Sequence, residues 1–146
     1  MIDPLVRRAE AADGDQLRWL EDLARTSLVD RRGGPRWLAT HAERCEEWAS
    51  AIDTCDVFVA YIDGVIVGYL VASRRDDVLV IDDVFVHVEA RELGFGDAML
   101  EAALAVGRQA GLRLLEGEAL PGDRDTKNLY ERAGIKARLI TVSTEL

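Results

Sequence analysis

The segment from Val84 to Leu100 constrains the fold more than any other part of the chain. It reads as an apolar strand, a tight turn that contains Gly94 and Gly96, and an apolar helix that begins near Asp97. Glycine tolerates positive φ angles and allows a ligand to approach the backbone closely. The first turn of a helix adds unpaired N–H groups and the positive end of the helix dipole. The segment therefore predicts a phosphate or pyrophosphate site.

The composition predicts a single globular domain over residues 1–146, with 49% hydrophobic and 31% charged residues. No apolar run approaches the roughly 20 residues that span a bilayer, so we expect no membrane association. The net charge of −9 argues against a nucleic-acid partner and favours a cationic substrate, although acidity also serves solubility alone.

The N-terminal residues lack a basic segment followed by an apolar one, so a signal peptide is not expected. The two cysteines, Cys45 and Cys55, do not make a disulfide framework. Both observations favour a cytoplasmic location.

The first half of the chain predicts one strand and two helices. The strand covers residues 5–9, and a helix over residues 16–28 carries Leu17 and Leu20 at helical spacing. Pro35 can begin a second helix over residues 35–52. This helix pair either shapes a substrate pocket or simply covers a sheet.

Three antiparallel strands are expected next, at residues 57–62, 65–71 and 78–88. The first two are joined by Asp63-Gly64, a strong signal for a two-residue hairpin. After the glycine turn, the sequence predicts a helix over residues 98–110 that Gly111 ends.

A strand over residues 112–119 then makes a strand–helix–strand unit, which implies a parallel pair. Asp125 or Thr126 is expected to cap a short helix that runs through Tyr130 and stops at Gly134. The apolar residues near position 140 predict a last strand over residues 135–146.

Two families of phosphate-binding turn fit the sequence poorly. A dinucleotide fingerprint needs a third glycine where Met99 stands, and it follows a parallel strand rather than an antiparallel meander. A P-loop needs Gly-Lys-Ser/Thr at the start of the helix, where this chain has Gly96-Asp97-Ala98.

The turn Arg91-Glu92-Leu93-Gly94-Phe95-Gly96 instead resembles the R/Q-x-x-G-x-G/A motif of the GCN5-related N-acetyltransferases (GNAT). Leu129 to Ile135 is similar to the L-Y-E-x-x-G-F segment of that family, and the resemblance spans Asp56 to Ile135. It implies an α/β (α+β) acyl-CoA N-acyltransferase fold. That fold has a mixed central sheet with an antiparallel N-terminal meander, a splayed parallel pair in the middle and helices on both faces.

The resemblance also implies a function. The chain would transfer an acetyl group from acetyl-CoA to a primary amine of a small molecule or peptide, by direct attack in a ternary complex. The alternative is a catalytically degenerate acyl-CoA-binding module that acts as a sensor or partner domain. Homodimers are common in the family, so a second subunit that completes the pocket is also considered.

The residues that would bind the cofactor follow from the same resemblance. They are Val86, His87, Val88, Arg91, Glu92, Leu93, Gly94, Phe95, Gly96, Asp97 and Asn128. Within this set the free edge of residues 86–88 would pair with the pantetheine arm, as a peptide adds to a strand.

Three residues are candidates for the chemistry. Tyr130 stands where the family carries a tyrosine that protonates the leaving thiolate, although its ring could simply pack on the cofactor. Glu118 ranks first and Asp83 second as the base. Both carboxylates could instead bind the positive charge of the substrate while water relays the proton.

A metal site is not expected. His41 and Cys45 stand four residues apart on the predicted second helix, but the nearby sequence supplies no further pair of ligands.

Overall fold

The computed structural model describes residues 3–146. Met1 and Ile2, the first residues of the N-terminal segment in which no signal peptide is expected, lie outside the described residues. Its strands form one sheet in the order β1-β2-β3-β4-β5. They are β1 (Leu5–Arg8), β2 (Asp56–Ile62), β3 (Val65–Arg75), β4 (Val78–Val86) and β5 (Leu114–Gly117). Pairing is antiparallel from β1 to β4 and parallel between β4 and β5, which confirms the predicted mixed sheet with its meander.

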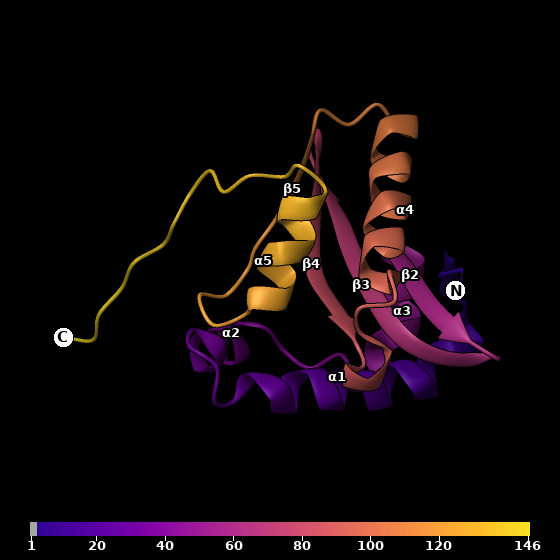
Figure 1. The fold of residues 1–146 in the computed structure, drawn as a ribbon, viewed down its shortest axis with the longest axis horizontal. Helices are drawn as coiled ribbons and strands as arrows, with labels where there is room; N and C mark the ends of the chain where they lie inside the picture. Colours follow the sequence, from indigo (N-terminus) through magenta and orange to yellow (C-terminus); the bar gives the residue numbers. More distant parts are fainter. Residues whose placement is uncertain (1–2) are drawn as a thin grey trace.

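Helices cover both faces of the sheet (Figure 1). The helices are α1 (Gly14–Leu28), α2 (Gly34–Thr40), α3 (Trp48–Thr54), α4 (Phe95–Gln109) and α5 (Arg124–Arg132). Alternate residues of β2 point to opposite faces, as the period of a strand requires. Val57 and Val59 pack with α1 and α3, whereas Phe58 and Ala60 pack with α4 and α5. Within residues 3–146, no helix has the length and apolar character that a membrane crossing demands.

Local turn signals in the sequence are confirmed. Asp63 and Gly64 join β2 to β3 with φ angles of 50° and 77°, as a two-residue hairpin requires. Gly111 and Gly134 follow α4 and α5 with φ angles of 72° and 75°. At these two positions the left-handed backbone ends a helix, for which glycine carries the smallest steric cost.

The parallel pair β4–β5 is splayed. Its register runs from Val78 opposite Leu114 to Ile81 opposite Gly117, while β4 itself continues to Val86. β4 therefore ends two residues earlier than the predicted strand over residues 78–88. The His87 ring accepts a hydrogen bond from the Glu89 N–H at 3.1 Å and starts a short 3-10 helix over Val88–Ala90.

The predicted helix over residues 35–52 is wrong, because the chain forms α2 and α3 with a break between them. The cause is Glu21, which is buried on α1. Its Oε1 accepts hydrogen bonds from the backbone N–H groups of Arg44, at 2.9 Å, and Cys45, at 3.4 Å. Cys45 takes a φ of 48°, outside helical geometry. His41 and Cys45 consequently do not share one helix face.

Two helix boundaries also differ from prediction. α4 begins at Phe95, three residues before the expected Ala98, with Gly94 as its N-cap. α5 is capped by Asp123, whose carboxylate accepts from the Thr126 N–H at 3.1 Å, instead of by Asp125 or Thr126. A side-chain acceptor placed before the first turn satisfies an otherwise unpaired donor.

The predicted last strand over residues 135–146 is wrong as well. Ile135 still donates its N–H to the Tyr130 carbonyl at 2.9 Å, but residues 136–146 form neither helix nor strand. They run away from the sheet (Figure 1), with Leu139, Ile140 and Val142 exposed by 88%, 81% and 87%. Strand preference reflects packing against a neighbouring strand, and this tail lies beside none in the described chain.

A variant that lacks residues 136–146 is expected to keep the free energy of unfolding within about 0.5 kcal/mol of the full chain, because few contacts are lost. Urea denaturation of both proteins, at two protein concentrations, measures the difference. Ile135→Ala serves as the control and should cost at least about 1 kcal/mol, since that side chain packs against the core. A concentration-dependent loss of stability on truncation would contradict the prediction.

Candidate functional site

A cleft of about 600 Å³ opens where β4 and β5 part. Most of the predicted site residues line it, namely Asp83, Val86, Arg91, Glu92, Gly94, Phe95, Gly96, Asp97, Glu118, Asn128 and Tyr130. Leu93 is not part of its lining. His87 and Val88 line a smaller neighbouring cavity together with Arg91. The structure thus brings the candidate acid, the candidate bases and most of the glycine turn to one cavity.

The glycine turn and the start of α4 line this cleft. Glu92 and Gly94 have φ angles of 65° and 86°, and Gly94 is the N-cap of α4. No side chain of the described residues caps α4, and Phe95, Gly96 and Asp97 form its first turn. The first N–H groups of a helix have no acceptor within the helix. Together with the helix dipole they make a site suited to an anion.

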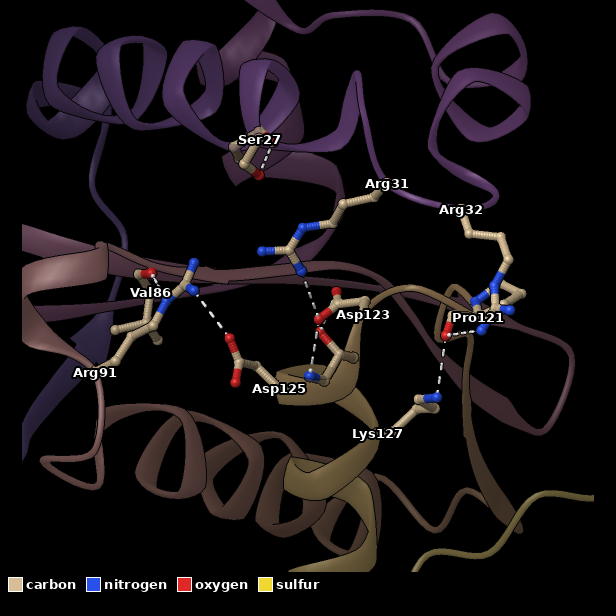
Figure 2. Close-up of polar contacts among 11 residues, drawn as sticks. Ser27, Arg31, Arg32, Val86, Arg91, Pro121, Asp123, Asp125 and Lys127 are labelled. Carbon is tan, nitrogen blue, oxygen red and sulfur yellow. Dashed lines mark hydrogen bonds and ion pairs between the residues drawn. The ribbon is translucent and has the colours of Figure 1, made fainter.

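The Arg91 side chain braces the turn. Its Nε donates to the Val86 carbonyl at 3.0 Å, and its Nη1 pairs with Asp125 Oδ2 at 2.9 Å (Figure 2). The guanidinium group also lies over the ring of Phe85. Arg91 therefore ties the end of β4 to the first turn of α5, while the backbone of the turn faces the cleft.

The absence of a side chain at Gly117 makes space for the Tyr130 hydroxyl. A Cβ atom added at Gly117 would lie 2.3 Å from Tyr130 Oη, so only a glycine at the end of β5 admits the hydroxyl. The Oη atom is buried and has no hydrogen-bond partner among residues 3–146. Burial, with smaller contributions from nearby carboxylates, raises the pKa of Tyr130 above its usual value. The hydroxyl therefore stays protonated at neutral pH and is free to donate.

Glu118 differs from the other carboxylates of the cleft. An arginine pairs with each of Asp82, Asp83, Asp97, Asp123 and Asp125. Within the described chain, Glu118 makes no ion pair or side-chain hydrogen bond, and it stands directly after Gly117. The Glu92 side chain likewise makes no ion pair or hydrogen bond among the described residues, but Glu92 lies in the glycine turn. Glu118 is consequently an unpaired cleft carboxylate, next in sequence to the glycine that the Tyr130 hydroxyl approaches.

Asp83 belongs to a buried network. Its Oδ2 accepts from Arg44 Nη1 and from Tyr69 Oη, both at 3.1 Å, and the same Nη1 pairs with Glu21 Oε2 at 2.7 Å. Burial raises the pKa of Asp83, although Arg44 and the Tyr69 hydroxyl act in the opposite direction. The Arg44 guanidinium thus links the Glu21 carboxylate of α1 to the Asp83 carboxylate of β4. Asp83 therefore takes part in a structural network.

Two loops close one wall of the cleft. Arg31, at the end of α1, pairs with Asp123 Oδ1 at 3.2 Å (Figure 2). The carbonyl of the next residue, Arg32, accepts from the Gly122 N–H at 3.2 Å, and the Arg32 guanidinium donates to the Pro121 carbonyl. The segment between α1 and α2 is therefore fastened to the segment between β5 and α5.

Sequence reasoning missed Gly117, Arg31 and Arg44. An isolated glycine inside a strand often marks a site where another group approaches the backbone closely, so the sequence offered a signal for Gly117. Arg31 and Arg44 find their partners across the fold, and no local pattern marks them.

Comparison with known proteins identifies the family. A model described as "Acetyltransferase (GNAT) family" matches residues 16–135, which is most of the chain. The chain belongs to the GNAT acetyltransferase family. A search of curated proteins gives no significant sequence match.

Solved structures share the GNAT fold at low sequence identity. An aminoglycoside acetyltransferase, AAC(6')-Iy, in complex with a CoA-containing bisubstrate analogue, aligns with a TM-score of 0.68 and 20% identity over 99% of this chain and 100% of its own. A ribosomal-protein-alanine N-acetyltransferase from Brucella melitensis aligns with a TM-score of 0.77 and 16% identity over 99% of this chain and 100% of its own. The PaiA N-acetyltransferase from Thermoplasma acidophilum, in complex with coenzyme A, aligns with a TM-score of 0.78 and 12% identity over 94% of this chain and 92% of its own. At these identities the likeness shows the fold.

Gly117→Ala is expected to destabilise this GNAT domain by about 1–3 kcal/mol, because the new Cβ must displace the Tyr130 hydroxyl. Gly14→Ala is the matched control. Nothing lies within 4 Å of its added Cβ and its backbone is helical, so it should stabilise by about 0.4–1 kcal/mol. Chemical denaturation measures both. Equal effects of the two substitutions would exclude the close approach at Gly117.

Arg44→Met should cost about 3–5 kcal/mol of unfolding free energy, since it leaves Glu21 and Asp83 without their cation. The control is Arg18→Ala, which removes an exposed pair with Glu46 and should cost about 1 kcal/mol or less. The triple variant Arg44→Met/Glu21→Gln/Asp83→Asn should regain part of the loss. A loss for Arg44→Met no larger than that of the control would refute the network.

Proposed function

We propose that the chain is an N-acetyltransferase that transfers an acetyl group from acetyl-CoA to a primary amine by direct attack in a ternary complex. The observation that carries the proposal is the buried Tyr130 hydroxyl. It is unpaired within residues 3–146, and the cleft that Tyr130 lines is also lined by Glu118, a carboxylate without a partner among those residues. A pure binding module has no need for a protonated donor and an unpaired acceptor at the point where two strands part. The protein names of the structural neighbours add support.

The residues of the cleft fit acetyl-CoA as the co-substrate. The N–H groups from Glu92 to Asp97 would hold the pyrophosphate, and the charge of Asp97 is already balanced by Arg132 at 3.0 Å. Beyond Ile81, no described strand pairs with the edge of β4 that faces β5, so this edge is open to an extended arm. Two of the neighbours were solved with CoA or a CoA-containing analogue. Bound there, acetyl-CoA supplies a thioester carbonyl and a thiolate leaving group.

The residues of the chain would then manage two protons. Glu118 attracts the acceptor ammonium and takes one proton from it, which leaves the neutral amine that forms the new C–N bond. The adduct loses its second nitrogen proton to solvent, and Tyr130 gives its own proton to the sulfur as the C–S bond breaks. The first proton then passes through solvent from Glu118 to Tyr130, so one proton is released overall. The products are the amide and the free thiol. Asp83, which is held by Arg44 and Tyr69, would keep β4 in place.

Other parts of the prediction stay open to experiment. The acceptor is either a small molecule or a peptide, and the neighbours include enzymes named for both kinds. A cytoplasmic location and a homodimer remain predictions, as do the roles of His87, Val88 and Leu93 in cofactor binding.

Tyr130→Phe should lower kcat by about 10²-fold, since a general acid typically contributes that much or more. Its affinity for acetyl-CoA should stay within about twofold, and its stability should not fall, because the lost hydroxyl makes no hydrogen bond in the described structure. Thiol release measures kcat and calorimetry measures affinity. Glu118→Gln should likewise lower kcat/KM for the amine and spare the affinity for acetyl-CoA.

Glu116→Gln is the control, because Glu116 of β5 is an exposed glutamate like Glu118 but does not line the cleft. It should leave both measurements unchanged. Tight binding of acetyl-CoA without amine-dependent thiol release would instead identify a binding module and refute the enzyme. An unchanged kcat for Tyr130→Phe would remove the tyrosine from the mechanism.

A further inference from the structure

One side of the cleft is apolar and aromatic. Its non-polar lining comes from α1, α2, β4 and the segment between β5 and α5, and it includes Ala24, Leu28, Trp37, Phe85 and Leu120. These elements lie apart from the glycine turn in sequence, and the contacts from Arg31 to Asp123 and from Gly122 to Arg32 hold them in place. This side is therefore available to an acceptor when the turn holds the donor.

Trp37 is a rigid, flat part of this side. Its ring stacks on His41 with centroids 4.2 Å apart and an interplanar angle of 6°. Arg25 fixes the pair, because its Nη1 donates to the His41 carbonyl at 2.7 Å and its guanidinium lies over the Trp37 ring. Trp37 and His41 both line the cleft, so this fixed pair of rings offers an aromatic contact to an apolar group there.

The carboxylates on this side of the cleft provide one uncompensated negative charge. Asp82 pairs with Arg75 and Asp83 pairs with Arg44, both at 3.1 Å. Asp123 is used fully, because it binds Arg31 and also accepts two hydrogen bonds from Thr126. Among the described carboxylates of this side, Glu118 alone is uncompensated.

The arginines also oppose a second positive charge. Arg31 and Arg75 line the cleft themselves. A second ammonium would have to displace one of them from its carboxylate or lie close to it, and juxtaposed like charges are unfavourable.

We propose that the acceptor is a monoamine with a planar, apolar body, of the arylalkylamine class, whose ammonium lies at Glu118 and whose ring packs on Trp37. The inference rests on the proposed acetyl transfer and specifies its acceptor. Polyamines and aminoglycosides carry several ammonium groups and need several free carboxylates. A peptide would place backbone polar groups against the side chains of Ala24, Leu28 and Leu120, which cannot form hydrogen bonds with them.

Steady-state thiol release with acetyl-CoA and a panel of amines tests the class. The panel contains 2-phenylethylamine, tryptamine, n-hexylamine, spermidine, kanamycin and a peptide with a free N-terminal alanine. The two aromatic monoamines should exceed spermidine, kanamycin and the peptide by about tenfold or more in kcat/KM, and n-hexylamine should fall between.

Trp37→Ala tests the aromatic contact. It should lower kcat/KM for 2-phenylethylamine about tenfold and leave that for n-hexylamine within about twofold, which separates a lost ring contact from a general defect. Trp19→Ala is the matched control, because Trp19 is an exposed tryptophan of α1 outside the lining of the cleft. It should change neither value.

Arg75→Gln tests the charge argument. It frees Asp82, a half-buried residue of β4 that lines the cleft, so KM for spermidine should fall while KM for 2-phenylethylamine stays unchanged. Arg113→Gln is the control, since it removes an exposed pair with Asp77 away from the cleft and should affect neither amine.

The outcomes separate the two proposals. If no amine of the panel accelerates thiol release, the proposed acetyl transfer fails, and the inference fails with it. If amine-dependent release occurs and spermidine, kanamycin or the peptide is preferred, the acetyl transfer stands and the monoamine class is overturned. Equal losses for 2-phenylethylamine and n-hexylamine in Trp37→Ala would also overturn the ring contact.

Discussion

The parallel pairing of β4 with β5 stops at Ile81 and Gly117, while β4 runs on to Val86, and the rest of the site depends on that separation. It exposes an edge of β4 and opens the cleft between the two strands. It also brings the end of β5 over α5, where the missing side chain of Gly117 admits the Tyr130 hydroxyl. A β5 paired along the whole of β4 would close the cavity in which donor and acceptor are proposed to meet.

Local signals account for the parts of the structure that the sequence predicted well. The Asp63-Gly64 hairpin, the glycine turn before α4 and the ends of α4 and α5 each depend on a few neighbouring residues with special backbone angles. The strand–helix–strand unit followed from chain order and handedness. The grouping of Glu118, Tyr130 and the turn at one cavity follows from this topology, so the resemblance to the family placed most of the site.

Long-range contacts account for what the sequence could not predict. Glu21 on α1 takes the backbone donors of Arg44 and Cys45, and no pattern between residues 35 and 52 reveals this competition with helix formation. The apolar tail has the composition of a strand, but among residues 3–146 no strand lies next to it. The arginine partners of the cleft carboxylates likewise come from distant segments, so the exceptional position of Glu118 becomes visible only in three dimensions.

The two sides of the cleft are encoded in different stretches of the chain. The anion-binding turn lies within residues 91–97, whereas the aromatic side comes mainly from residues 24–41 and 118–123. The ion pair that Arg91 of the turn makes with Asp125 goes to α5, outside the segments that form the aromatic side. Substitutions on α1 and α2 can therefore alter the choice of acceptor while the donor site is inherited intact, which makes this architecture open to divergence in specificity.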